Sequence, residues 1–310
     1  MRLLFKIQFA IIAFALLAFA QTTFSQANST PYPFTSSLVP KDAYVFYVIG
    51  DWGRKGKYFQ KDVATAMNTC AAQAKPKFIA STGDNFYTFG VKTTTDKLWK
   101  KSFEDIYNGS NIKDIDWYVV LGNHDGYGNI HAQIDYSKKN LHWKLPTAYH
   151  SYVAPVNQTD SAEFIFTYTG PLANTNSAST QAQWNWIDSS LANSTAKWKF
   201  VFGHHPVYSS NPLHGDTWAL IEKLKPMLEK YHVPAYFAGH DHDLQHQQPK
   251  GSSVDYFVSG AGSKLRPSGT YAHTKFARSV AGFAVVALSG NKMTVWFIDK
   301  DANVIYSYSK

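Results

Sequence analysis

The chain contains 310 residues, of which 45% are hydrophobic and 17% charged, and its formal net charge is +8. This length is enough for one large α/β domain or two small ones. The lysines are scattered rather than gathered in blocks, so the composition does not indicate a nucleic-acid-binding protein and instead predicts a mildly basic surface that attracts anions.

The first residues have the pattern of an export signal. Arg2 and Lys6 give a positive start, Ile7–Phe19 is almost wholly apolar, and Ala18-Phe19-Ala20 offers a small-x-small cleavage site. The apolar run is shorter than the roughly 20 residues that a membrane-spanning helix needs. We therefore predict a cleaved signal peptide over 1–20, a secreted or periplasmic protein, and no membrane segment in the mature form.

The remaining chain reads as a short leader followed by one domain. The polar stretch 21–40 contains three prolines and predicts an N-terminal leader or linker. No linker or internal repeat interrupts 41–310, so we predict a single domain there. Its only cysteine, Cys70, excludes an intrachain disulfide and falls in a helical pattern, where we expect it to be a buried, small apolar residue.

Strand and helix patterns alternate through the first two thirds of the chain, which predicts an α/β fold with a largely parallel sheet. Helical patterns cover Tyr58–Ala74, Asp96–Tyr107, Ile130–Asn140, Thr180–Leu191 and Asp216–Tyr231. The stretch Leu172–Ser179 is rich in Asn, Thr and Ser and predicts a loop. An antiparallel portion is expected after Ser253, with strands over Val254–Val258, Phe283–Leu288 and Met293–Ile298.

Five apolar runs lead into a glycine that is followed directly by a candidate metal ligand. The junctions are Gly50-Asp51, Gly83-Asp84, Gly122-Asn123-His124-Asp125, Gly203-His204-His205 and Gly239-His240-Asp241-His242. Apolar runs of this length suit buried strands, and open α/β sheets bind ligands beyond the carboxyl ends of such strands. One junction, or even two, could arise by chance, but five with Asp, Asn and His predict a metal-centred active site.

The residue types at these junctions indicate which metals they would bind. The oxygen ligands and the imidazoles together favour iron, zinc or manganese over calcium or magnesium; they are Asp51, Asp84, Asn123, His204, His240 and His242. Two histidines two positions apart in an extended segment place both rings on one side, where they can serve two adjacent metals. Such a pair of ions suits in-line displacement at phosphorus, and we expect Asp84 to bridge them.

These motifs resemble those of the calcineurin-like metallophosphoesterases, and more narrowly the small, tartrate-resistant animal type of purple acid phosphatase. The narrower resemblance rests on Gly50-Asp51-Trp52-Gly53, Gly83-Asp84-Asn85-Phe86-Tyr87, Ala132–Lys138, His214-Gly215, Leu244-Gln245 and Ser259-Gly260-Ala261-Gly262. It extends from about Tyr44 to Ile298. It implies a four-layer α/β/β/α sandwich, in which helices flank two mixed sheets and 41–310 form the catalytic domain.

The resemblance implies two metal sites that share one carboxylate. Asp51, Asp84, Tyr87 and His242 would form a ferric site. Asp84, Asn123, His204 and His240 would bind a second, divalent ion of iron, zinc or manganese. Tyr87 distinguishes this centre from one with two divalent metals, because a phenol with a pKa of about 10 binds as phenolate only beside a strong Lewis acid such as Fe(III).

The same resemblance implies an exported acid phosphatase that acts as a monomer on small phosphate monoesters, with metal-bound hydroxide attacking phosphorus in line. It implies that His124 holds the phosphate and assists the leaving group, and that His214 donates a proton to that group. His205 replaces a tyrosine of the mammalian enzymes and either contacts phosphate or fills space. Two other functions stay open: a phosphodiesterase or nucleotide hydrolase on the same centre, and a non-hydrolytic protein that uses iron for redox chemistry or phosphate binding.

Overall fold

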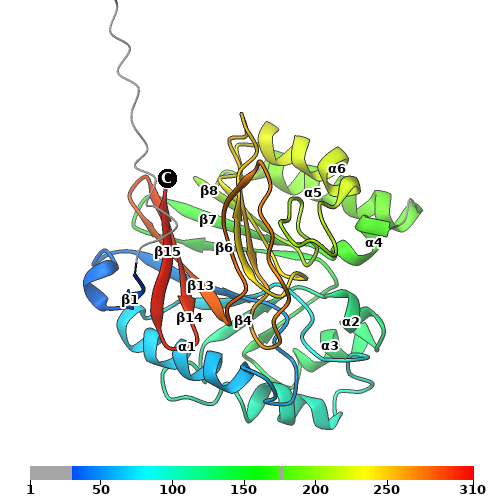
Figure 1. Cartoon of the computed structure of the whole chain (residues 1–310). Coiled ribbons are helices and arrows are strands. Elements are labelled where there is room, and N and C mark those ends of the chain that lie inside the picture. Colours follow the sequence, from blue (N-terminus) through cyan, green and yellow to red (C-terminus); the bar gives the residue numbers. More distant parts are fainter. Residues whose placement is uncertain (1–29, 175–176) are drawn as a thin grey trace, which may run out of the picture.

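The computed structural model describes residues 30–174 and 177–310, which form two face-to-face β-sheets with helices on both outer faces (Figure 1). The predicted signal peptide over 1–20 lies outside the described residues. Within the predicted leader, Tyr32–Pro33 pairs with the last strand of the chain, and Phe34 packs edge-on against Trp296 with ring centroids 5.9 Å apart. The described end of the leader is thus attached to the domain.

The first sheet has eight strands and combines the N-terminal parallel strands with the C-terminal antiparallel ones. In spatial order they are β1 (Tyr32–Pro33), β15 (Asn303–Ser309), β14 (Lys292–Asp299), β13 (Gly282–Ser289), β2 (Tyr44–Ile49), β3 (Phe78–Ser81), β4 (Asp116–Val119) and β5 (Trp143–Lys144). Strands β2 to β5 are parallel to one another, and the other pairs are antiparallel. The antiparallel strands predicted over Phe283–Leu288 and Met293–Ile298 are therefore confirmed as β13 and β14.

The second sheet has seven strands and is also mixed. Their order is β12 (Thr274–Arg278), β10 (Leu244–Gln247), β11 (Asp255–Ser259), β9 (Ala235–Ala238), β8 (Trp198–Phe202), β7 (Ser161–Phe166) and β6 (His150–Pro155). Strands β7, β8, β9 and β11 are parallel, whereas β10 and β6 run antiparallel to their neighbours. The strand predicted over Val254–Val258 thus has one antiparallel neighbour, as expected, and one parallel neighbour.

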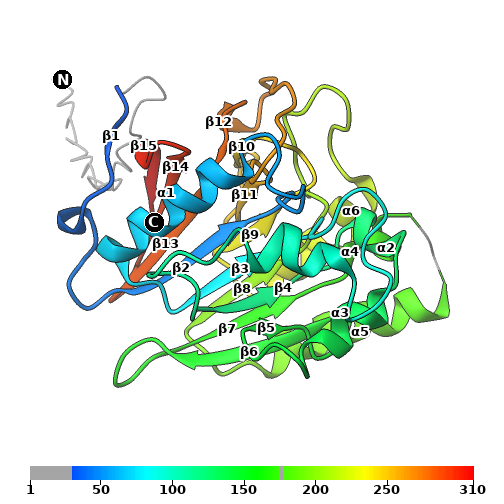
Figure 2. The ribbon, with the colours of Figure 1, turned by 90° about the horizontal axis from the view of Figure 1, so that it is seen from below.

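Helices cover the outer faces of both sheets (Figures 1 and 2). They are α1 (Gln60–Ala74), α2 (Asn123–Gly126), α3 (Ile130–Tyr136), α4 (Thr169–Asn174), α5 (Ala178–Asn193) and α6 (Trp218–Lys230), with a π-helix over Trp99–Glu104 and a 3-10 turn over Ser36–Leu38. Each of the five predicted helices is present, mostly with shorter ends. The loop predicted over Leu172–Ser179 is wrong at both ends. Buried Leu172 packs into the outer core and holds α4 helical through Asn174, and α5 already begins at Ala178.

The layer between the two sheets is largely aromatic. Phe46 on β2 is fully buried, and its ring lies 5.1 Å from that of Phe78 and 5.3 Å from that of Phe164, which belongs to the opposite sheet. A second core lies between the first sheet and α1, where Cys70 is buried as predicted. A third lies between the second sheet and α5 and α6. These three cores confirm the four-layer α/β/β/α sandwich.

The described residues contain no helix with both the length and the apolar character that a bilayer crossing requires.

Candidate metal centre

Five of the seven predicted metal ligands follow closely after a strand, at the edge where the two sheets meet. Asp51 and Asp84 follow β2 and β3, and Asn123 begins α2 after β4; all three belong to the first sheet. His204 follows β8, and His240 follows β9 in the second sheet. The parallel strands of each sheet end together, so the sequence pattern of strand, glycine and ligand brings these side chains to one place.

The backbone at the ligands explains why glycine precedes them. Asp51, Asp84 and His240 have φ angles of 60°, 52° and 68°, in the left-handed region that non-glycine residues seldom adopt. These sharp turns pack against one another without space for a side chain. A Cβ atom on Gly122 would lie 2.2 Å from Oδ1 of Asp84, and one on Gly239 would lie 2.6 Å from Oδ2 of Asp51. Glycine is thus required for the strand ends to approach.

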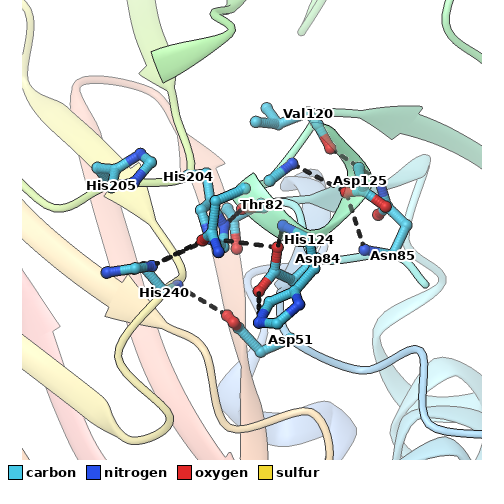
Figure 3. Close-up of polar contacts among 12 residues, drawn as sticks. Asp51, Thr82, Asp84, Asn85, Val120, His124, Asp125, His204, His205 and His240 are labelled. Atoms are coloured by element: carbon cyan, nitrogen blue, oxygen red, sulfur yellow. Dashed lines mark hydrogen bonds and ion pairs between the residues drawn. The ribbon is translucent and has the colours of Figure 1, made fainter. Parts of the chain in front are cut away.

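One group of ligand atoms contains an amide and the imidazoles of His204 and His240, which are labelled in Figure 3. Oδ1 of Asn123 lies 2.9 Å from Nε2 of His204 and 3.1 Å from Nδ1 of His240, and the two imidazole nitrogens are 3.2 Å apart. Oδ1 of Asp84 is 3.5 Å from Nε2 of His204. The four residues that the resemblance assigns to a divalent site therefore converge.

A second group contains the phenol. The hydroxyl of Tyr87 lies 2.8 Å from Oδ1 of Asp51 and 3.1 Å from Nε2 of His242, and the last two atoms are 3.4 Å apart. Asp84 links this group to the first, because Asp51, Asp84 and His204 each offer a ligand atom within 4.8 Å of the others. The predicted ligands of both sites thus form one continuous cluster, with Asp84 between its two groups.

Two of the imidazoles are held in the tautomer that metal binding requires. Nδ1 of His204 donates to the carbonyl of Thr82 at 2.9 Å, and Nδ1 of His242 donates to the carbonyl of Lys264 at 2.8 Å. In each ring the Nε2 lone pair then faces the ligand cluster. Backbone carbonyls that orient ligating histidines in this way are a usual feature of metal sites.

The electrostatics of the cluster fit a bound cation. Burial raises the pKa of Asp51 well above its usual range, and the nearby Asp84 carboxylate raises it further. Burial, followed by the charges of Asp51 and Asp84, raises the pKa of Tyr87. Burial also lowers the pKa of His242 to about 2, which makes the imidazole neutral. A metal cation compensates the negative charge of buried oxygen ligands, and a neutral imidazole can bind it through a nitrogen lone pair.

Asp125 holds the two ligand-bearing loops together. Its Oδ2 accepts from the backbone N–H of Gly122 at 2.8 Å and of Asn85 at 3.0 Å. Its Oδ1 accepts from the N–H of Phe86 at 3.2 Å and from the amide of Gln133 at 2.9 Å. This buried carboxylate therefore fixes the loop after β3 relative to the loop after β4.

Both predicted catalytic histidines lie beside the ligand cluster. Nδ1 of His124 donates to the carbonyl of Thr88 at 2.6 Å, and its Nε2 is 3.9 Å from Oδ2 of Asp84. Nδ1 of His214 lies 2.6 Å from Oδ1 of Asp241, and the His214 ring stacks on His240 with centroids 4.4 Å apart. The side chains are 20% and 30% exposed, so a ligand from solvent can reach them.

His205, for which two roles were open, has the contacts of a packing residue. Its ring is 4.6 Å from that of His240, and its Nδ1 lies 3.0 Å from the hydroxyl of Thr169. Burial lowers its pKa to about 3, so the imidazole is neutral. These contacts favour space filling over an ionic contact with phosphate.

Sequence reasoning missed two arginines at the cluster. Cζ of Arg54 lies 3.4 Å from the ring centroid of Tyr87, and Nη1 of Arg266 lies 3.0 Å from Nε2 of His214. The sequence could have indicated them: the chain has only four arginines, and two of these closely follow the Gly50–Gly53 and Ser259–Gly262 motifs. Sequence spacing alone did not show which way their side chains would point.

Comparison with known proteins places this geometry among phosphoesterases. Residues 44–244 match the family described as calcineurin-like phosphoesterase. Tartrate-resistant acid phosphatase type 5 of Mus musculus is 32% identical, with 89% of this chain and 92% of that protein covered. Purple acid phosphatase 4 of Arabidopsis thaliana is 33% identical, with 87% and 84% covered.

Solved structures show the same fold. GAP50, the anchor in the inner membrane complex of Plasmodium, superposes with a TM-score of 0.78 at 27% identity, covering 86% of this chain and 88% of that one. The purple acid phosphatase PPD1 of yellow lupin gives a TM-score of 0.66 at 16% identity, covering 90% of this chain and 54% of that one, which is evidence for the fold alone.

Proposed function

Because the chain belongs to the calcineurin-like phosphoesterase family and, within it, to the purple acid phosphatases, we propose that it is an exported acid phosphatase with a dinuclear Fe(III)–M(II) centre. Membership of this family makes the protein a phosphoric monoester hydrolase with a dinuclear metal centre. The metals, the roles of individual residues and the cellular location are parts of the proposal.

The observation that carries the proposal is the position of the Tyr87 hydroxyl between Asp51 and His242. A phenol in this position favours a trivalent ion, because only a strongly polarising cation displaces its proton at ordinary pH. Asp51, Asp84, Tyr87 and His242 would hold Fe(III). Asp84, Asn123, His204 and His240 would hold Fe(II), Zn(II) or Mn(II).

A pair of metal ions supplies an activated water for in-line attack and neutralises charge on the phosphoryl group. The protein supplies positioning. The hydrogen bond from Nδ1 of His124 to Thr88 keeps Nε2 facing the cluster, where a proton on it would hold a phosphate oxygen and assist the leaving group.

His214 is proposed to donate a proton to the leaving alkoxide. Its Nδ1 is held by Asp241, which leaves Nε2 as the donating atom. In this arrangement Nε2 accepts from Arg266 at 3.0 Å, because a guanidinium can only donate. Proton donation by His214 thus requires that Nε2 leave Arg266 and take up a proton from the acidic solvent before it contacts the leaving group.

Export rests on the sequence of the first twenty residues. A positive start, an apolar run and a small-x-small site support a cleaved signal peptide and a secreted or periplasmic enzyme. Sequencing the N-terminus of protein recovered from the medium or periplasm tests this. A mature chain that starts at about residue 21 agrees with the proposal, whereas an intact Met1 contradicts it.

Turnover of matched substrates decides among the three candidate functions. Purified protein, loaded with iron and zinc, is assayed at acidic pH with 4-nitrophenyl phosphate and bis(4-nitrophenyl) phosphate. We expect kcat/KM to be higher for the monoester. A higher value for the diester would make the protein a phosphodiesterase, and no turnover of either by metal-replete protein would leave a non-hydrolytic role.

A further inference from the structure

Two positive side chains flank the candidate centre on the side of Tyr87 and His242. The guanidinium of Arg54 stacks over the ring of Tyr87, with Cζ 3.4 Å from its centroid. Arg266 is anchored to His242, because its backbone N–H donates to the His242 carbonyl at 3.1 Å.

No carboxylate of the described residues forms an ion pair with either arginine. The ion pairs found among residues 30–174 and 177–310 use lysines and histidines and no arginine. Nε of Arg54 is buried and has no hydrogen-bond partner among these residues. A guanidinium carries five N–H donors in a planar fork that matches carboxylate and phosphate, and an unpaired buried donor is costly.

Arg266 is held in place by a chain of hydrogen bonds. The hydroxyl of Ser209 donates to Oδ2 of buried Asp241, whose Oδ1 accepts from Nδ1 of His214. Nε2 of His214 then accepts from Nη1 of Arg266 at 3.0 Å. A cation whose orientation is fixed before a ligand arrives loses little freedom on binding.

The surface beside these arginines is open to solvent and carries a third cation. Tyr58 is 58% exposed, and its ring centroid is 5.7 Å from Cζ of Arg54 and 5.7 Å from Nζ of Lys264. Lys264 itself is exposed. An anion can therefore reach this surface from outside without displacing a packed side chain.

Both arginines lie near the two histidines that are proposed to act on the leaving group. Arg266 contacts His214, and the ring of Tyr87, which Arg54 covers, lies 4.5 Å from the ring of His124. These two histidines are the residues to which the proposed function assigns the leaving group. The arginines therefore lie on the side of the substrate from which the alcohol departs.

We propose that Arg54 and Arg266 form an anion-binding subsite beside the metal centre, which binds a negatively charged group on the leaving alcohol. The subsite makes phosphate monoesters that carry a carboxylate or a second phosphate better substrates than monoesters of neutral alcohols. This inference rests on the proposed function, because it assigns the substrate class of the same site.

Two matched substrate pairs test the subsite and show whether it binds a carboxylate or a phosphate. 3-Phosphoglycerate is compared with glycerol 3-phosphate for the carboxylate, and fructose 1,6-bisphosphate with fructose 6-phosphate for the phosphate. The readout is the ratio of kcat/KM within each pair, measured for the wild type and for Arg54→Met, Arg266→Met and Arg266→Lys. Because each ratio is internal to one variant, partial loss of folded or metal-loaded enzyme does not change it.

A charge-assisted hydrogen bond is worth about tenfold to a hundredfold in binding. We expect the wild type to prefer the anionic member of at least one pair by about that factor, and each Arg→Met variant to lower the ratio by about fivefold or more. The pair that responds identifies the anion. Arg266→Lys should lower the ratio less than Arg266→Met, because lysine keeps the charge and loses the planar fork.

Lys292→Met is the charge control. Lys292 is the exposed first residue of β14 and pairs with Ser289 of β13, whose neighbour Leu288 pairs with the start of β2, at the opposite end of the sheet from Asp51. Its ratios should equal those of the wild type. A wild type without preference in either pair, or Arg→Met ratios that fall no further than in Lys292→Met, would overturn the subsite. Turnover of no monoester would refute the proposed function instead.

Discussion

Asp51, Asp84 and His240 adopt positive φ angles although none of them is glycine. Such conformations cost free energy and persist where the surrounding structure requires them. Here hydrogen bonds hold all three: the N–H of His240 donates to Oδ2 of Asp51 at 2.8 Å, and the N–H of His124 donates to Oδ1 of Asp84 at 2.9 Å. At the residue scale, the strain serves to aim ligand atoms at one point.

The role assigned to His124 predicts that its loss lowers turnover without changing metal binding. His124→Ala removes Nε2 from the face of the cluster but none of the proposed ligands, so the metal content should equal that of the wild type. Loss of a positioned proton donor should lower kcat by about a hundredfold to ten-thousandfold. Metal analysis and steady-state kinetics on the same preparation check this, and unchanged kcat would remove His124 from the mechanism.

The role assigned to Asp125 predicts that its substitution weakens metal binding itself. Asp125→Asn places an amide NH2 against backbone N–H donors of Gly122, Asn85 or Phe86, whichever way the amide is turned. Because the loops that it joins carry Asp84 and Asn123, metal affinity should fall about tenfold to a hundredfold. Competition with a chelator measures the change. The matched control is Asp135→Asn on the exposed face of α3, and equal affinity in both variants would contradict the assigned role.

At the scale of elements, the sequence predicted what depends on local pattern. Five strands, each followed by glycine and a ligand, are where expected, because hydrophobic runs and glycine turns have local causes. The loop predicted at Leu172 was wrong, because packing of one buried leucine against α5 and α6 outweighed the polar composition around it. Arg54 and Arg266 were missed because the direction of a side chain depends on contacts that are distant in sequence.

His150 on the edge strand β6 is expected to make the folded protein less stable in acid. The ring of His150 is buried and stacks on Phe166 at 4.9 Å, and burial lowers its pKa to about 4, opposed in part by the Thr147 backbone. Between pH 6.5 and about 4 the unfolded chain binds a proton here that the folded chain does not. The free energy of unfolding therefore falls as the pH falls through this window, by about 3 kcal/mol in total.

His150→Phe should remove this term and keep the stack on Phe166. We expect the variant to gain stability relative to the wild type as the pH is lowered through the window, measured by urea unfolding at a series of pH values. His131→Phe, at an exposed position on α3, is the control and should follow the wild type. A difference between His150→Phe and the wild type that does not change with pH would contradict the prediction.

At the scale of the whole molecule, the candidate centre draws its predicted ligands from both sheets. The first sheet supplies the oxygen donors Asp51, Asp84 and Asn123, and the second supplies the imidazoles of His204 and His240. A cation shared by both sets binds only the folded protein, so its binding free energy adds to the stability of the whole sandwich.

Removal of metal should therefore destabilise the entire domain. At a free metal concentration of about a thousand times Kd, binding adds about 4 kcal/mol to the free energy of unfolding. We expect a chelator to lower the Tm of the wild type by several degrees, and readdition of iron and zinc to restore it. His204→Ala should show a smaller response. Equal Tm values with and without metal would refute a centre that links the sheets.

The visible absorption spectrum of the iron-loaded protein tests the central claim most directly. Ligation of Fe(III) by the Tyr87 phenolate predicts a broad charge-transfer band in the visible region, which Tyr87→Phe abolishes while metal analysis still finds iron. Iron-replete protein without the band, or a band that persists in Tyr87→Phe, would contradict the tyrosinate–iron centre.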